Sequence, residues 1–420
     1  MSRAFCVSAH RWAGLTTAGF LVIVGLTGSV LAFRDDLDVL LNPDLLTVAP
    51  RETPMLDPLT LRDRALRLHP GARIDEAPLH LDGGRSYEIR VRPKDSDGTE
   101  RLLFLYLDPY TGERIGERAW DRNAFGRRGA LFFIYRLHYA LAAPASFGAL
   151  GRYVLGAVAL IWTVDCFVAF FLTLPVARRK ETKGGGKSCW RRWRSAWLIK
   201  LAGGFYRINF DVHRASGLWT WALLFVFAWS GVMFNLNEVY APVTRALLGL
   251  SQPLAGLPSP AARTSEPSLS CRAAHARGRI LISELAARES FEIKNEQALV
   301  LDRGHAFYKY SVRSSRDIGE HAQTTVFFDA NDGSLRLASL PSSDHELAGD
   351  KVSRWLRALH TASVFGRPMH ILVSVMGLLV AVLSISGVYI WWRKRAARFT
   401  HAGRLLKAST AAETASRALL

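Results

Sequence analysis

The stretch HRASGLWTWALLFVFAWSG, from His213 to Gly231, places a histidine and an arginine directly before a run of apolar residues. A second stretch, HRWAGLTTAGFLVIVGLTG from His10 to Gly28, begins in the same way, has a glycine soon after the histidine and closes on a glycine. His10 and His213 are 203 positions apart, and so are Gly28 and Gly231. The chain therefore contains an internal repeat, and each copy includes a histidine at the start of an apolar helix.

Four segments of the chain are long and apolar enough to cross a membrane. At about 20 or more residues each, they match a hydrocarbon core of about 30 Å. Charged residues are almost absent from them, with Asp165 as the exception. The first apolar run is too long for a signal peptide, so we expect an uncleaved helix. The predicted spans are roughly residues 12–33, 153–175, 217–236 and 369–392.

The charge distribution orients these spans and argues against nucleic-acid binding. The net charge of +18 is carried largely by basic residues that flank apolar segments, rather than by a basic stripe on a polar domain. The short loop between spans two and three and the start of the tail are rich in lysine and arginine, which predicts that both are cytoplasmic. Both termini would then be inside, and the long loops 34–152 and 237–367 would face outward.

The cysteines argue against three kinds of site. Cys271 alone falls in an outward loop, so this topology offers no outward pair for a disulfide. The sequence has no C-x-x-C motif, which argues against a structural zinc site, a dithiol redox centre and covalently attached haem.

The two outward loops share a pattern of helix, strands and turn. DPYTGERIG, which begins at Asp108, has the chemistry of a turn between two strands, and Asp329 and Gly333 lie 221 positions after Asp108 and Gly112. We expect two small α+β domains, each with one helix packed on an antiparallel sheet. The aspartates and glycines of these turns are expected to have structural roles.

Five histidines lie at or near span ends. The topology places His10 and His213 at the inner face, and His138 and His360 at the outer face. His370 follows Pro368 in the first turn of span four. Neutral imidazole is a good axial ligand for haem iron, and two facing imidazoles close a six-coordinate site suited to electron transfer. The alternative is that each histidine caps its helix or anchors it to headgroups. Two histidines per face make a poor zinc site.

Asp165 is a candidate for function because it is an ionisable residue inside a span. Two interpretations remain open from the sequence. The carboxyl group relays protons, or it is a neutral acid bonded to Ser230, Thr27 or a backbone carbonyl.

Several motifs in combination resemble one bacterial family. HRASGLW, WTVDCFVAFFLTLP, FGRPMHILVSVMGLLVAVLSISGVYIWWRKR and DPYTGERIG look like the PepSY-associated transmembrane family, over nearly the whole chain from His10 to Arg395. The resemblance implies an inner-membrane protein with periplasmic PepSY domains. Some family members are implied to bind two b-type haems and to reduce ferric siderophores. Carried over residue by residue, the haem-iron ligands would be His10, His213, His138 and His360, with His370 as the alternative to His360.

The expected fold is therefore an α-helical membrane protein with four transmembrane helices in a pseudo-twofold repeat and two periplasmic α+β PepSY-like domains. The predicted segments are the first span (1–36), the first outward domain (37–126), an interfacial helix with span two (127–177), a basic cytoplasmic loop (178–211), span three (212–237), the second outward domain (238–350), an interfacial helix with span four (351–395), and a cytoplasmic tail (396–420).

The expected function is ferric-siderophore reduction by a haem b oxidoreductase with two haems, surrounded by membrane lipids and with no nucleic-acid partner. The sequence has no dinucleotide fingerprint, because KGGGK in the inner loop lacks the strand–turn–helix setting, so a cytoplasmic or quinol electron donor is needed. The alternative is a non-catalytic PepSY membrane protein that binds or regulates a periplasmic partner such as a peptidase. A transporter that uses Asp165 is a third option.

Overall fold

The computed structural model describes residues 2–94, 98–121, 125–176, 188–251, 267–319, 323–343 and 346–417. It divides into two compact units. The first unit contains Met1–Ser29, His138–Leu236 and Ser374–Leu420, and the second contains Val30–Leu137 and Asn237–Val373. Residues 178–187 of the predicted basic loop 178–211, which include KGGGK, lie outside the described residues.

The first unit is built from long apolar helices, which confirms that the chain is a membrane-type protein. Three helices in the described residues are long and apolar enough to span a bilayer. A bent pair of helices, counted as one span, brings the number to four. The three are α1 (Arg3–Leu31), α6 (Leu150–Thr173) and the part of α13 (Arg367–Arg417) that runs to Ala397. The bent pair consists of α8 (Phe205–Trp219) and α9 (Trp221–Asn235). Short helices α7 (Cys189–Trp193) and η2 (Arg194–Trp197) precede α8.

The third predicted span, roughly 217–236, corresponds to this bent pair of helices and not to one continuous helix. The helix begins earlier, at Phe205, and bends by 71° at Thr220. The hydroxyls of Ser216 and Thr220, one turn apart, each bond to the carbonyl four residues earlier, on Val212 and on Ser216. Such back-bonding bends helices because it competes with the backbone ladder. At 15 residues α9 extends only about 22 Å, so the end of α8 is needed to complete a span.

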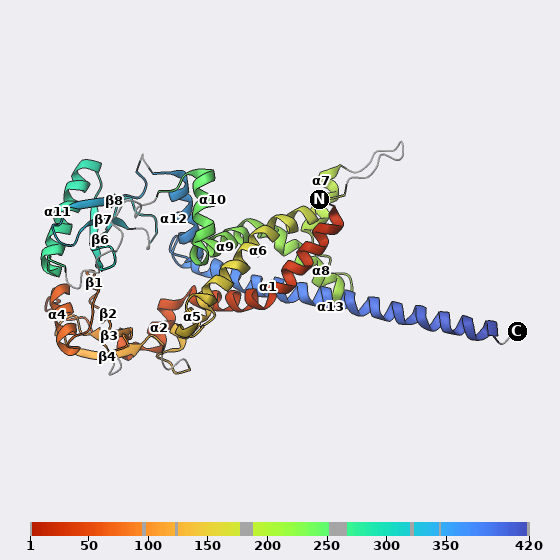
Figure 1. The fold of residues 1–420 in the computed structure, drawn as a ribbon, viewed down its shortest axis with the longest axis horizontal. Helices are drawn as coiled ribbons and strands as arrows, with labels where there is room; N and C mark the ends of the chain where they lie inside the picture. Colours follow the sequence, from red (N-terminus) through yellow and green to blue (C-terminus); the bar gives the residue numbers. More distant parts are fainter. Residues whose placement is uncertain are drawn as a thin grey trace. The chain divides into compact units, whose positions relative to one another are not determined.

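Small residues bring the helices of the first unit close together. A Cβ atom added at Gly25 would lie 2.5 Å from the carbonyl oxygen of Gly377, so α1 and α13 touch through their backbones. A Cβ atom at Gly231 would lie 3.0 Å from that of Ala159, where α9 packs on α6 (Figure 1). Close contacts of this kind are typical of membrane helices, since association there depends on packing and not on the hydrophobic effect.

Large apolar side chains on the outside of these helices form continuous stripes. On α6 and α13 the exposed residues recur every three or four positions, which places them on one face of each helix. A bilayer covers such a face, whereas water would not favour it. The exposed residues are Ile161, Val164, Phe167 and Phe171 on α6 and Ile371, Val375, Leu378, Val382 and Ile385 on α13.

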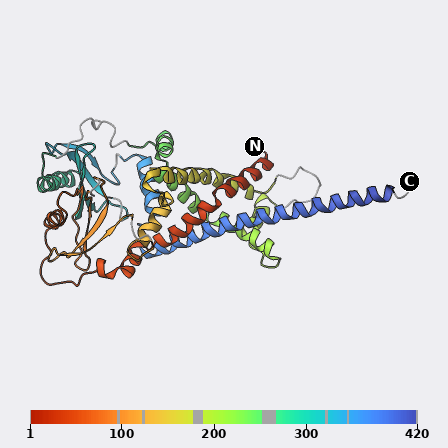
Figure 2. The ribbon, with the colours of Figure 1, turned by 60° about the horizontal axis from the view of Figure 1, so that its bottom comes forward.

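The second unit contains all eight strands of the described residues, in two antiparallel sheets (Figure 2). The three-stranded sheet has the order β2-β3-β4, and the five-stranded sheet has the order β1-β5-β6-β7-β8. The strands are β1 (Glu76–Pro78), β2 (Tyr87–Val91), β3 (Leu103–Leu107), β4 (Arg114–Ala119), β5 (Ile293–Asp302), β6 (Phe307–Ser314), β7 (Thr324–Asp329) and β8 (Leu335–Ser339). The helices are α2 (Arg34–Leu41), α3 (Pro43–Leu46), α4 (Pro58–Leu68), α5 (Ala130–Ala140), which continues into the first unit, α10 (Asn237–Leu248), α11 (Cys271–Glu289) and α12 (Ala348–His360).

The prediction that each outward domain has a sheet of its own was wrong in one respect. Strand β1 comes from the first outward segment, yet it pairs with β5 of the second, with Ala77 opposite Leu299. Leu59, Ala77 and Leu79 are buried in the same core cluster as Leu299. The ten-residue β5 would otherwise leave a long unpaired edge, and β1 covers part of it while adding apolar side chains to the core.

The structural role expected for the two turns is confirmed. Asp108 Oδ1 accepts hydrogen bonds from the backbone N–H groups of Tyr110 and Thr111, at 2.8 and 3.1 Å. Asp329 Oδ1 accepts the equivalent bonds from Asn331 and Asp332. Gly112 and Gly333 have φ angles of +69° and +72°, a region that favours glycine. The 221-residue repeat therefore preserves the turn geometry.

Candidate functional site

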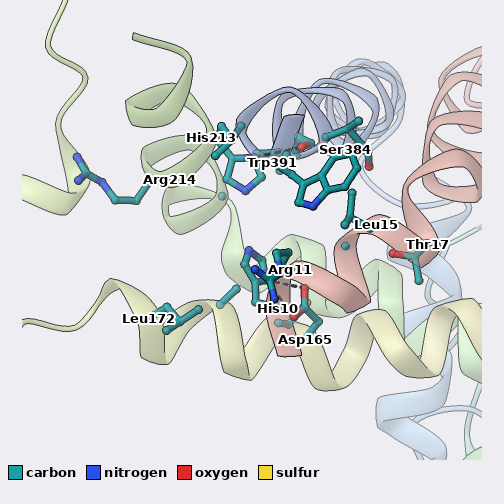
Figure 3. Close-up of a pocket in the computed structure, with 18 of the residues that line it drawn as sticks. His10, Arg11, Leu15, Thr17, Asp165, Leu172, His213, Arg214, Ser384 and Trp391 are labelled. Atoms are coloured by element: carbon teal, nitrogen blue, oxygen red, sulfur yellow. Dashed lines mark hydrogen bonds and ion pairs between the residues drawn. The ribbon is translucent and has the colours of Figure 1, made fainter. Parts of the chain in front are cut away.

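A cavity lies in the first unit, between α1, α6, α8 and α13. Its volume is about 930 Å³, within the usual range for ligand pockets. His10 on α1 and His213 on α8 both line it, and their rings lie on opposite sides of the space shown in Figure 3. The walls between them are mainly apolar and aromatic, and Trp391 is one of these residues.

His10 is held by the single carboxylate that lines this cavity. Its Nδ1 atom lies 2.9 Å from both carboxylate oxygens of Asp165 on α6 (Figure 3). An ionised carboxylate only accepts hydrogen bonds, so this contact needs the ring proton on Nδ1. In neutral imidazole the Nε2 atom then carries the lone pair that can bind a metal ion.

His213 has the same tautomer for a different reason. Its Nδ1 atom lies 3.1 Å from the carbonyl oxygen of Leu383 and 2.9 Å from Ser386 Oγ, both on α13. A carbonyl oxygen only accepts, so Nδ1 donates and Nε2 again carries the lone pair. A Cβ atom on Gly387 would lie 3.2 Å from the ring, so glycine at this place lets α13 approach the imidazole closely.

The two rings lie close enough to act on one ligand. Their centroids are 6.2 Å apart and their planes are inclined by 56°. The sequence prediction that His10 and His213 share a site is consistent with this distance.

Two glycines related by the internal repeat also line the cavity. Gly14 lies one turn after His10, and Gly217 one turn after His213, so each shares a helix face with its histidine. A Cβ atom at Gly14 would meet nothing within 4 Å, and one at Gly217 would meet only Leu383 Cδ2, at 3.8 Å. The protein therefore leaves open space beside each imidazole that an ordinary side chain would occupy.

The cavity wall carries an excess of positive charge. Five cationic residues line it, against Asp165 as its one acidic residue. The Nε atom of Arg11 is buried and has no hydrogen-bond partner among the described residues, so the wall contains a donor in need of an acceptor. The cationic residues are Arg3, Arg11, Arg214, Lys394 and Arg395.

His138, predicted for the outer site, also lies in the first unit. It is in the last turn of α5, with its Nδ1 atom 3.0 Å from Thr27 Oγ1. The Thr27 hydroxyl donates to the carbonyl of Ile23 at 2.6 Å, so it accepts from His138, whose proton is then on Nδ1. A Cβ atom at Gly28 would lie 3.0 Å from this ring, which explains the closing glycine of the first repeat.

His360 and His370, the two residues predicted as alternative ligands at the outer face, belong to the second unit. His360 is the last residue of α12 and is half-buried. His370, in the first turn of α13, packs edge-on against Phe33 with ring centroids 5.8 Å apart. Its Nδ1 atom is buried and has no partner among the described residues.

Sequence reasoning missed the partners of the imidazoles. The partners suggested for Asp165 were wrong, since Ser230 Oγ bonds to carbonyls of its own helix and Thr27 meets His138. Ser386 was not considered, although its place in LSISG, a polar pair inside an apolar run, was a usable signal.

Comparison of the sequence with protein-family models gives a match over nearly the whole chain. The family model described as the PepSY-associated TM region matches residues 7–394. A search of curated proteins found no match.

Proposed function

Because the chain belongs to the PepSY-associated TM region family, we propose that it is an inner-membrane oxidoreductase that binds two b-type haems and reduces ferric siderophores in the periplasm. The observation that carries the proposal is the cavity in which His10 and His213 face each other with Nε2 as the lone-pair nitrogen. In this proposal both termini are cytoplasmic, and the helices form a four-span pseudo-twofold repeat. The second unit then contains two periplasmic PepSY domains, joined through β1 and β5.

The spacing of the inner pair of histidines supports a shared metal. Two imidazole nitrogens that bind one metal ion from opposite sides at about 2 Å each lie about 4 Å apart, which puts the ring centroids roughly 6 Å apart. The centroids of His10 and His213 are 6.2 Å apart.

The cavity is also chemically suited to haem. The glycines beside the imidazoles leave room for a flat macrocycle, and the apolar walls suit its faces. The cationic residues, with the unsatisfied Nε atom of Arg11, are suited to carboxylate groups such as propionates. The donor set of two neutral imidazoles per site is one that haem iron accepts.

Each protein group has a defined task in this proposal. Bound haem would supply a one-electron iron couple. His10 and His213 would hold the haem iron through their Nε2 atoms. Asp165 and Ser386 fix the tautomers, and the apolar walls exclude water. His138 would be one ligand of the outer haem.

The substrate in this proposal is the ferric ion of a periplasmic chelate. Hard oxygen ligands of a siderophore bind Fe(III) more tightly than Fe(II), so one-electron reduction weakens the complex and releases iron. The electrons would enter near His10 and His213 from a cytoplasmic or quinol donor and leave near His138.

A reoxidation experiment tests this function. The purified protein is reduced with a limiting amount of dithionite and mixed rapidly with a ferric hydroxamate siderophore in the presence of an Fe(II) chelator. We expect the reduced haem bands to decay as the Fe(II) chelate forms, while the iron-free siderophore leaves them unchanged. A haem-free preparation from cells with adequate haem, or reduced haems that the ferric siderophore does not oxidise, would contradict the proposal. A haem-free result would favour the non-catalytic alternative.

A further inference from the structure

Asp165 is an acidic residue within a helix that is long and apolar enough to span a membrane. It is residue 16 of the 24 in α6, and its side chain is 14% exposed. A carboxylate is costly at such a place and is retained when it has a partner and a function. Its partner is His10, whose Nδ1 atom lies 2.9 Å from both oxygens.

We propose that Asp165 is the positioning residue of the inner haem and that its charge lowers the reduction potential of that haem. This inference rests on the proposed function. The carboxylate holds the proton of His10 on Nδ1 and turns Nε2 towards the cavity. It also makes Nε2 a stronger electron donor, as carboxylates bonded to metal-binding histidines do. A stronger donor and a nearby negative charge both favour Fe(III) over Fe(II).

The second ligand of the same site provides the comparison. The Nδ1 atom of His213 donates to a hydroxyl and a backbone carbonyl, both of which are neutral. The charged partner is therefore on one side of the site, although the internal repeat would make the two sides equivalent.

Among the described residues the hydrogen-bond partner of Asp165 is His10, which does not favour the proton-relay interpretation. The nearest suggested partners, Ser230 and Thr27, direct their hydroxyls to carbonyls of their own helices. The contact to His10 instead involves both carboxylate oxygens at equal distance, which is the geometry of an orienting partner.

Two substitutions separate charge from hydrogen bonding. In Asp165→Asn the amide oxygen still accepts from Nδ1 while the charge is lost, so we expect nearly full haem content with a raised potential of the inner haem. A tenfold weaker preference for Fe(III) corresponds to a rise of about 59 mV in the reduction potential of a one-electron couple. In Asp165→Ala both effects are lost, and we expect a 10- to 100-fold loss in affinity for the inner haem. Val164→Ala, at the neighbouring exposed position of α6 and not part of the cavity wall, is the control and should change neither quantity.

The measurements are a spectroelectrochemical titration of both haems and a haem titration of the haem-free protein. Variant Ser386→Ala should shift the inner potential less than Asp165→Asn does, because it removes no charge. An unchanged inner potential in Asp165→Asn, with full haem content, overturns the tuning role. An unchanged haem affinity in Asp165→Ala overturns the positioning role.

A readout on the haem-free protein keeps the two proposals apart. Nitrogen-15 NMR of labelled histidines should show His10 protonated on Nδ1 in the wild type and a mixture of tautomers in Asp165→Ala. If no haem binds at all, the proposed function fails. A mixed tautomer in the wild type would overturn the contact with Asp165 itself, whether or not haem binds.

Discussion

Gly14→Leu is the substitution that most clearly distinguishes an effect on the cavity from an effect on the stability of helix α1. Gly14 lines the cavity one turn after His10, and an added Cβ atom would meet nothing within 4 Å. The Cβ atom of a leucine here would therefore lie in open space, in contact with no other protein atom. Gly19→Leu is the matched control, because Gly19 lies in the same helix, is exposed, and also has nothing within 4 Å of an added Cβ atom.

Both variants should raise the stability of the haem-free protein, but only Gly14→Leu should weaken haem binding. Replacing glycine by leucine within a helix stabilises it by about 0.5–1 kcal/mol in either place. Side-chain atoms forced into an occupied, packed site cost about 1–3 kcal/mol, which corresponds to a loss of about 5- to 150-fold in affinity. We expect this loss for the inner haem of Gly14→Leu and none for Gly19→Leu.

The assay is a haem titration of the haem-free protein in detergent, followed by visible absorbance, with the outer site as an internal reference. Thermal unfolding of the haem-free variants checks that both remain folded. Unchanged inner-site affinity in a folded Gly14→Leu protein would refute the assignment of the cavity to haem. An equal loss in Gly19→Leu would refute the argument from space.

Three further predictions concern the second unit. Asp38→Ala should lower the free energy of unfolding of this unit by about 3–5 kcal/mol, measured by denaturant unfolding. The reason is that the Arg118 guanidinium, which is 2% exposed and bonded to Asp38 at 2.7 and 2.8 Å, would be left buried without its carboxylate. An equal loss in Asp38→Asn would show that the charge matters, and an unchanged stability of Asp38→Ala would contradict the account. Gly112→Ala should cost about 1–2 kcal/mol, since φ is +69° there, and an unshifted unfolding midpoint would count against the turn geometry. The hydrogen bond from His275 lowers the pKa of Glu296 below its ordinary value of 4.5, so this carboxylate contributes stability above that pH which is lost as the pH falls through the lowered pKa. Glu296→Gln should therefore flatten the fall in unfolding temperature below about pH 5, and a parallel fall in both proteins would refute this.

Much of the membrane part could be predicted from the sequence, because apolar length and the 203-residue repeat are local signals. The bend at Thr220 was missed, since a serine and a threonine inside an apolar helix are ordinary until their hydroxyls bond back to the helix. The pairing of β1 with β5 was missed for another reason. Strand pairing across more than 200 residues depends on which edges the fold leaves open, and no local pattern encodes that.

The candidate site also combines features that could be predicted from local sequence with contacts that could not. The repeat identified His10 and His213 as a pair, because their equivalence can be read from letters alone. The contact between His10 and Asp165 could not be read in this way, because it joins positions 155 residues apart on two different helices. The sequence did single out Asp165 as a charge inside a span, which is the physical signal that a partner must exist.

The most direct test of the central claim is the haem content of the purified protein, measured as the pyridine haemochrome per chain in the wild type and in His213→Ala. If His10 and His213 hold one haem and a second site lies at His138, the wild type contains two haems and the variant contains one, with one reduced α band lost. A wild-type protein without haem, or a His213→Ala protein that keeps both haems or loses both, would contradict the claim.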